Sequence, residues 1–156
     1  MSESSWATFA TDAPDLAIRA RAKFEGAKHH VLATLAADGS PRVHGVEVQF
    51  HRDDLTVGMM SPSMKARQLL RDGRFALHAN PGDDMGPGDT KLAGIALEVT
   101  DPEALDAYIE QVQPPPPFHM FRLLLSDVVV TSLHPDGDRL VIQLWRPDAG
   151  ITTFER

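Results

Sequence analysis

The sequence predicts a mainly β domain, a closed or partly closed antiparallel barrel with helices plugging its ends. Six or seven stretches read as strands, and several of them alternate apolar with polar side chains, whereas only three segments read as helices. The connections between the early strands are too short for parallel crossovers. With 156 residues, 42% hydrophobic and 24% charged, we expect a single domain over 1–156.

The N-terminal part is expected to begin with a flexible segment over residues 1–12 and to continue as a helix over 13–27. Thr11 or Asp12 can cap this helix, and Pro14 suits its first turn. Its apolar side chains fall on one stripe, which consists of Leu16, Ala20, Phe24 and Ala27.

Strands follow the first helix. Asp38-Gly39, between the apolar stretch 31–35 and the longer stretch 42–51, is the strongest hairpin signal in the chain. Residues 52–54 turn the chain again, into a third strand over 55–59. These three strands are expected to form an antiparallel meander, because their connections are short.

The second half of the chain alternates helices with strands. A helix over 64–71 follows the break Ser61-Pro62-Ser63, and Gly73 marks its end. A short helix is expected from Asp101 to about residue 112, then a stiff polyproline connector over 114–117 and a polar tail from Arg146. Four further strands are expected, over 74–79, 91–100, 121–133 and 139–145.

Composition excludes several classes of protein. The absence of cysteine rules out disulfides, thiolate metal sites and cysteine nucleophiles. The formal net charge of −7, with no basic tract, argues against nucleic-acid binding. No apolar run is long enough to span a membrane, and the N-terminus does not resemble a signal peptide. We therefore expect a cytoplasmic protein without a membrane or nucleic-acid partner.

Common motifs for metals and nucleotides are missing. The seven histidines include no pair with the i, i+4 spacing of a helical metal site, so no dedicated metal site is expected. The chain also lacks a glycine-rich dinucleotide loop, a phosphate-binding P-loop and the Gly-x-Ser-x-Gly elbow of hydrolases.

One cluster combines hydroxyl groups with positive charge. Residues 61–67 contain Ser61, Ser63, Lys65 and Arg67 at the point where a strand ends and a helix begins. A helix N-terminus offers free N–H groups and partial positive charge, so this cluster is a candidate phosphate site. A plain capped helix with solvated basic side chains is the equally weighted alternative.

The order of short motifs resembles the pyridoxamine 5′-phosphate oxidase-like family, the FMN-binding split barrels, over roughly residues 13–150. These motifs are Ala33-Thr34-Leu35, Asp38-Gly39, Pro41-Arg42-Val43, Ser63-x-Lys65-x-x-x-Leu69, Arg71-Asp72-x-Arg74, Gly94 to Pro102, and Trp145-Arg146-Pro147. The resemblance implies a six-stranded antiparallel Greek-key split barrel with a few flanking helices. It also implies a homodimer with FMN between the protomers.

The resemblance further implies a set of cofactor-binding residues. Ser63, Lys65 and Arg67 would hold the FMN phosphate, and Gly45 would permit close approach of the backbone to the ring. The remaining candidates are Arg42, Val43, His44, Met59, Met60, Ser61, Trp145 and Arg146. For Trp145, simple core packing at a strand end is an equally weighted alternative.

The implied function is that of an FMN-dependent oxidoreductase acting on a small molecule, with no catalytic acid or base assigned. Pyridoxamine phosphate oxidases proper end in a longer tail with a second arginine and a histidine that bind substrate phosphate. The segment Trp145 to Gly150 offers no equivalent, which argues against vitamin B6 oxidation. An F420-dependent reductase, or a haem- or ligand-binding protein without redox turnover, are the alternatives on the same fold.

Overall fold

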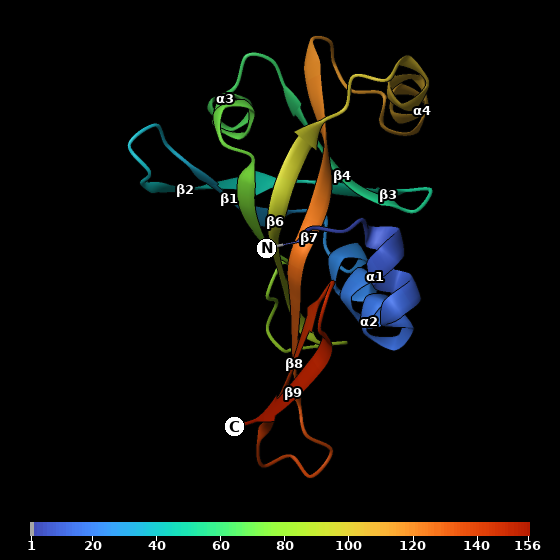
Figure 1. Cartoon of the computed structure of the whole chain (residues 1–156), viewed down its shortest axis with the longest axis vertical. Helices are drawn as coiled ribbons and strands as arrows, with labels where there is room; N and C mark the ends of the chain where they lie inside the picture. Colours follow the sequence, from blue (N-terminus) through green and yellow to red (C-terminus); the bar gives the residue numbers. More distant parts are fainter. Residues whose placement is uncertain (1) are drawn as a thin grey trace.

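Nine strands form one antiparallel sheet in residues 2–156, the part of the chain that the computed structural model describes. They are β1 (His30–Leu35), β2 (Pro41–Val46), β3 (Val48–His51), β4 (Asp54–Met60), β5 (Arg74–His78), β6 (Asp89–Glu98), β7 (Phe118–Leu133), β8 (Leu140–Arg146) and β9 (Gly150–Glu155). The helices are α1 (Trp6–Asp12), α2 (Pro14–Glu25), α3 (Met64–Arg71) and α4 (Pro102–Val112). The predicted mainly β split barrel is confirmed (Figure 1).

The barrel closes through one bent strand. The sequence predicted a single strand over 42–51, but the chain breaks at Glu47 into β2 and β3. β2 pairs with β1 and β3 pairs with β4, both antiparallel, so the predicted meander pairings form, but the middle strand is divided into two at Glu47. The strand order β2-β1-β5-β6-β7-β4-β3 therefore begins and ends on the two sides of Glu47. Counting β2 and β3 as one strand gives the expected six for the barrel.

Alternating side chains fill the barrel, and one glycine lets two strands come unusually close. Phe75, Leu77 and Leu92 point inward and are buried, whereas their neighbours along β5 and β6 face outward. The register between β6 and β7 shifts at Ala93/Gly94, which is a β-bulge. A Cβ at Gly94 would lie only 1.8 Å from the Leu124 carbonyl oxygen.

The N-terminal segment corrects the expectation of flexibility for residues 1–12. Ser5 caps α1 by accepting a hydrogen bond from the Thr8 N–H, and Trp6 and Phe9 are buried. The ring centroids of Phe9 and Trp145 lie 4.8 Å apart, so α1 packs on the barrel core. These large aromatic side chains lose their contact with water on packing, which outweighs the weak helical periodicity of a seven-residue helix.

The C-terminal segment is also more ordered in structure than the sequence suggested. The predicted polar tail from Arg146 contains β9, which pairs with β8 and turns through Gly150 at φ +68°. β7 is 16 residues long, and its second half carries this β8–β9 hairpin. The hairpin extends from the barrel at the end opposite α3 and α4 (Figure 1).

The helices α3 and α4 match the sequence predictions for 64–71 and for the segment after Asp101. Ser63 accepts a hydrogen bond from the Ala66 N–H, and Asp101 accepts one from the Ala104 N–H, so both helices begin with a side-chain cap. The two helices stand at the same end of the barrel (Figure 1). Among residues 2–156, no helix is long and apolar enough to cross a membrane.

Candidate functional site

A cavity of about 380 Å³ opens at the barrel end where α3 and α4 stand. It has three sides: the β2–β4 strands with the bend at Glu47, the start of α3, and the end of α4 with the proline segment. The residues that line it are His29, Gly45, Val46, Glu47, Gln49, Gly58, Met59, Met60, Lys65, Tyr108, Val112, Pro114, Pro115 and Phe118. Its volume falls in the range of small-molecule sites, roughly 300–1,000 Å³.

The α3 side of the cavity carries its positive charge. Lys65 lines the cavity, and its Nζ donates a hydrogen bond to the Gly45 carbonyl oxygen over 3.2 Å. Ser63 lies at the N-cap with its hydroxyl engaged by the Ala66 N–H. Arg67 is exposed and does not line the cavity. The structure thus separates Lys65 from Arg67, as their spacing of two positions on a helix requires.

The strand side combines apolar side chains with one unpaired polar atom. Gly45, Met59 and Met60, all predicted site residues, line this side. A Cβ at Gly45 would meet no atom within 4 Å, so its backbone is open to a ligand. Oε1 of Gln49 is buried and has no hydrogen-bond partner among residues 2–156. A buried acceptor of this kind needs a donor, which a ligand can supply.

A carboxylate and a phenol face the same cavity. Oε1 of Glu47 lies 3.6 Å from Nζ of Lys28 and 3.5 Å from Nε2 of His29. Tyr108 is 2% exposed. Burial, and then the negative charge of Glu47, raise the pKa of its hydroxyl. Tyr108 is therefore protonated at neutral pH and able to donate a hydrogen bond.

Gly58 of β4 makes room for Tyr108. A Cβ at position 58 would lie 1.7 Å from the Tyr108 hydroxyl oxygen, so no other residue fits beneath this ring without displacing it. A glycine within a strand signals a close approach of another group, and this was the available sequence signal for the contact. Because the group that approaches comes from a helix 50 residues later, the sequence did not identify it.

The proline segment forms part of the cavity wall. The sequence predicted a surface connector over 114–117, and Pro115 to Pro117 are exposed. Pro114 and Pro115 nevertheless line the cavity together with Val112 and Phe118. The connector therefore also shapes the site, which a reading of proline stiffness alone did not predict.

Several predicted site residues lie away from the cavity. Trp145 has no exposed surface and packs against Phe9, so core packing replaces its assignment to the site. Nε2 of His44 lies 2.8 Å from the Thr34 hydroxyl and 3.1 Å from Oε1 of Gln68, in a polar network beneath α3. Those outside the lining of this single chain also include Arg42, Val43, Ser61, Ser63 and Arg146.

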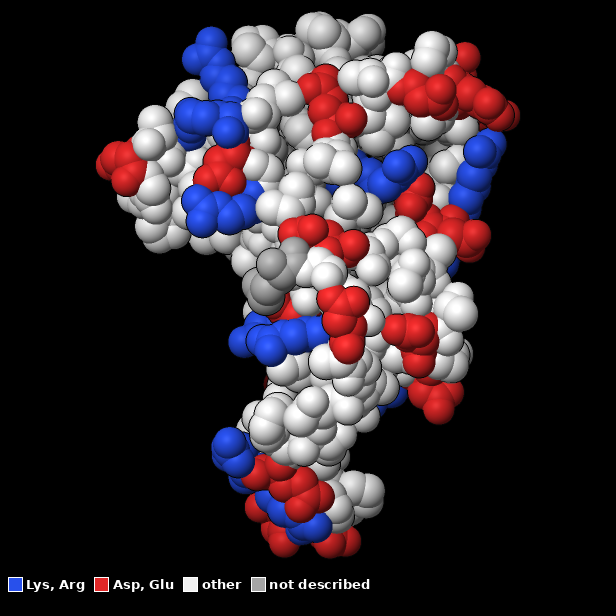
Figure 2. All heavy atoms as spheres, in the orientation of Figure 1, with Lys and Arg blue, Asp and Glu red and all other residues white. Residues whose placement is uncertain are grey.

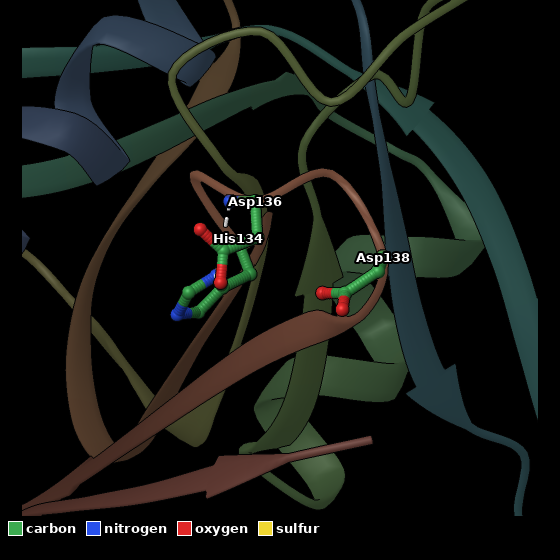
Figure 3. A group of neighbouring side chains, drawn as sticks. All are labelled: His134, Asp136 and Asp138. Carbon is green, nitrogen blue, oxygen red and sulfur yellow. Dashed lines mark hydrogen bonds and ion pairs between the residues drawn. The ribbon is translucent and has the colours of Figure 1, made fainter.

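A cluster of one histidine and two aspartates at the β7–β8 turn resembles a metal site in composition, but an arginine pairs with its carboxylates. One ligand atom from each of His134, Asp136 and Asp138 lies within 4.8 Å of the others (Figure 3). Arg139 supplies the cation that these carboxylates need: its Nη1 lies 2.7 Å from Asp138 and 3.4 Å from Asp136. Nε of Arg139 also lies 3.2 Å from Glu155, so the cluster ties the turn to β9.

Surface charge on the face shown in Figure 2 is mixed. Acidic and basic side chains alternate there over short distances, and no continuous basic tract follows any element. This agrees with the formal net charge of −7. This face therefore offers no continuous basic surface for the phosphate backbone of a nucleic acid.

Comparison with solved structures gives the fold. One match is an FMN-binding protein related to pyridoxamine 5′-phosphate oxidase from Nostoc punctiforme, with TM-score 0.62 and 14% identity over 89% of this chain and 93% of that chain. PhzG from Burkholderia lata, solved with tetrahydrophenazine-1-carboxylic acid, matches with TM-score 0.60 and 17% identity over 83% and 81%. The chain has the fold of the pyridoxamine 5′-phosphate oxidase-like, FMN-binding proteins.

A third solved structure is also similar to this chain. A NimC/NimA family protein from Clostridium acetobutylicum matches with TM-score 0.56 and 14% identity over 87% of this chain and 91% of that chain. No protein-family model and no curated protein match the sequence. The similarity to this split-barrel group is therefore carried by three-dimensional structure.

The cavity of this split barrel has groups that fit FMN. Lys65 suits a phosphate, because its ammonium group lies at the edge of the cavity where α3 begins. The apolar side chain of Met59 and the open backbone of Gly45 suit a flat ring. The unpaired Oε1 of Gln49 suits the ring's N–H donor.

Proposed function

We propose that this chain binds FMN in the cavity between α3, α4 and the bend at Glu47, and works as a flavin-dependent oxidoreductase on a small molecule. The observation that carries the proposal is the position of Lys65, the predicted phosphate residue, in the wall of this cavity together with Gly45, Met59 and Met60. Structural neighbours described as FMN-binding support the same choice of cofactor.

The protein's own residues would bind and orient the cofactor. Lys65 and the α3 N-terminus hold the phosphate, the Gly45 backbone lies against the ring, and Gln49 accepts a hydrogen bond from it. The flavin supplies the redox chemistry when bound, and the protein sets its position and limits access of water.

A second copy of the chain would complete the site. The outer face of the β1–β5–β6 sheet carries a row of small side chains, because Ala33 pairs with Ala76 and Ala76 pairs with Ala93. Val43 beside this row is 71% exposed. Small side chains allow two sheets to approach closely, and a two-fold interface uses such a face twice. Since Gly45 lies on β2 next to this face, a partner would cover the cavity mouth.

Ala76→Arg is expected to weaken the homodimer by at least about tenfold, since a charged side chain would then have to be buried at the centre of the alanine row. Sedimentation velocity at several concentrations measures the change. Lys91→Arg, on the neighbouring strand, keeps the charge and serves as the control. A wild-type chain that sediments as a monomer at micromolar concentration would contradict the proposed dimer.

The absorbance spectrum of the purified protein tests the cofactor. The expected result is a yellow protein with a flavin spectrum, or a colourless protein that acquires this spectrum on titration with FMN. A deazaflavin spectrum would instead identify an F420 protein, and a Soret band would identify a haem protein. Either of these outcomes would overturn the FMN assignment.

A further inference from the structure

We infer that the α4 side of the cavity is a substrate subsite for an uncharged, largely apolar molecule that carries a hydrogen-bond acceptor. This inference rests on the proposed function, because it assigns to substrate the side of the cavity that the FMN phosphate does not use. The wall consists of Tyr108, Val112, Pro114, Pro115 and Phe118, which follow one another along the chain.

The distribution of charge in the cavity gives the first argument. Lys65 is the one lysine or arginine among the lining residues of the described chain, and it lies on the α3 side. The α4 wall contains no cationic side chain. Glu47 is close enough to Tyr108 for its negative charge to raise the Tyr108 pKa. An anionic substrate at this wall would find no cationic side chain within the wall to pair with, and an unpaired charge is unfavourable in a partly buried site.

The Tyr108 hydroxyl gives the second argument. It forms no hydrogen bond within residues 2–156, although the residue is only 2% exposed. Gly58 lies directly against this ring, and a Cβ at position 58 would displace it. A hydroxyl that lines a cavity and has no protein partner is available to a ligand that accepts its hydrogen bond. A carbonyl, ether or nitro oxygen on an apolar ring has the required chemistry.

The shape of the wall gives the third argument. Prolines have no backbone N–H, and their rings offer flat apolar surface with little conformational freedom to lose on binding. Phe118 packs against Tyr108 with ring centroids 5.6 Å apart, so the aromatic surface is held in place before a ligand arrives. These features favour a flat apolar ligand over a flexible polar one.

Two ligands of nearly identical shape test the inference: 2-acetylnaphthalene, a neutral ketone, and 2-naphthoate, its carboxylate counterpart. Calorimetric titration into the FMN-loaded protein is expected to show the ketone binding at least about tenfold tighter. Tyr108→Phe should weaken the ketone about fivefold, as expected for one lost hydrogen bond, and should leave FMN affinity unchanged. Equal affinities for the two ligands, or no binding of the ketone, would overturn the inference.

Val112→Arg reverses the expected preference, because it places a cation in the wall. The variant should bind 2-naphthoate tighter than the ketone, and an arginine at a helix C-terminus is also compatible with folding. Ile109→Arg is the matched control: it makes a similar change on the same helix at an exposed position outside the cavity lining. A shift of preference in Ile109→Arg as large as in Val112→Arg would show that overall charge, not the wall, sets the preference.

Titration of both ligands into the FMN-free chain separates this inference from the proposed function. The wall is built by the chain alone, so the preference for the ketone should persist there, with lower affinity for both ligands. Failure of FMN to bind would overturn the proposed function and leave this result intact. Loss of the preference in protein that still binds FMN would overturn only the subsite.

Discussion

Lys65→Ala is expected to weaken FMN binding by about ten- to a hundredfold. The ammonium group lies in the cavity wall, and its one hydrogen bond within residues 2–156 goes to the Gly45 carbonyl oxygen over 3.2 Å. A phosphate brought to the same edge would gain a charged hydrogen bond worth about 1.5–3 kcal/mol. Fluorescence titration of FMN and of riboflavin, into both proteins, measures the effect of the phosphate separately from that of the ring.

The structure supplies a matched control for this variant. Arg67→Ala removes the same charge from the same helix, but Arg67 is exposed and outside the cavity lining, so FMN affinity should change by less than about threefold. Riboflavin should bind Lys65→Ala and wild type about equally. If the lysine variant loses riboflavin affinity as strongly as FMN affinity, Lys65 is no phosphate ligand.

Gly94→Ala is expected to lower the free energy of unfolding by about 3 kcal/mol. The added Cβ would lie 1.8 Å from the Leu124 carbonyl oxygen and 2.8 Å from its carbon, so backbone rather than a flexible side chain must move. That movement would disturb the longest pairing in the sheet, between β6 and β7. Equilibrium unfolding in urea, followed by circular dichroism, gives the difference.

Gly45→Ala is the control for the bulge, since its Cβ would meet nothing within 4 Å. In the FMN-free protein this substitution should change the free energy of unfolding by less than about 0.5 kcal/mol. A similar loss at both glycines would mean that lost strand flexibility, and not the close approach of β6 and β7, accounts for the effect at Gly94.

Local sequence signals predicted the elements with strong periodicity or caps. The helix over 64–71, the helix that begins after Asp101 and the Asp38-Gly39 hairpin are local features, and the structure contains each of them. The bend at Glu47 was not predictable in the same way. Its cause is global, because the barrel closes only if β2 and β3 pair with different neighbours.

The residues of the candidate site also fall into those predicted from local motifs and those placed by long-range contacts. Lys65, Gly45 and the two methionines of β4 belong to motifs near one another in sequence, and they do line the cavity. Tyr108 and the prolines reach it only because α4 folds back over β4, a long-range arrangement that single residues do not encode. For Trp145 the structure supports core packing, the alternative to a site role, and the α1 residue Phe9 that packs on it comes from a segment expected to be flexible.

The bend at Glu47 places the cavity where the first and last strands of the barrel sheet, β2 and β3, meet. Val46 on one side of the bend and Gln49 on the other both face the cavity, and each belongs to a different hydrogen-bonded edge of the sheet. A ligand bound there would contact both edges. Because it would bind only the closed barrel, its binding free energy would add to the free energy needed to separate the two edges. Ligand binding in this cavity and opening of the barrel are therefore thermodynamically linked, and Glu47 lies where the two edges meet.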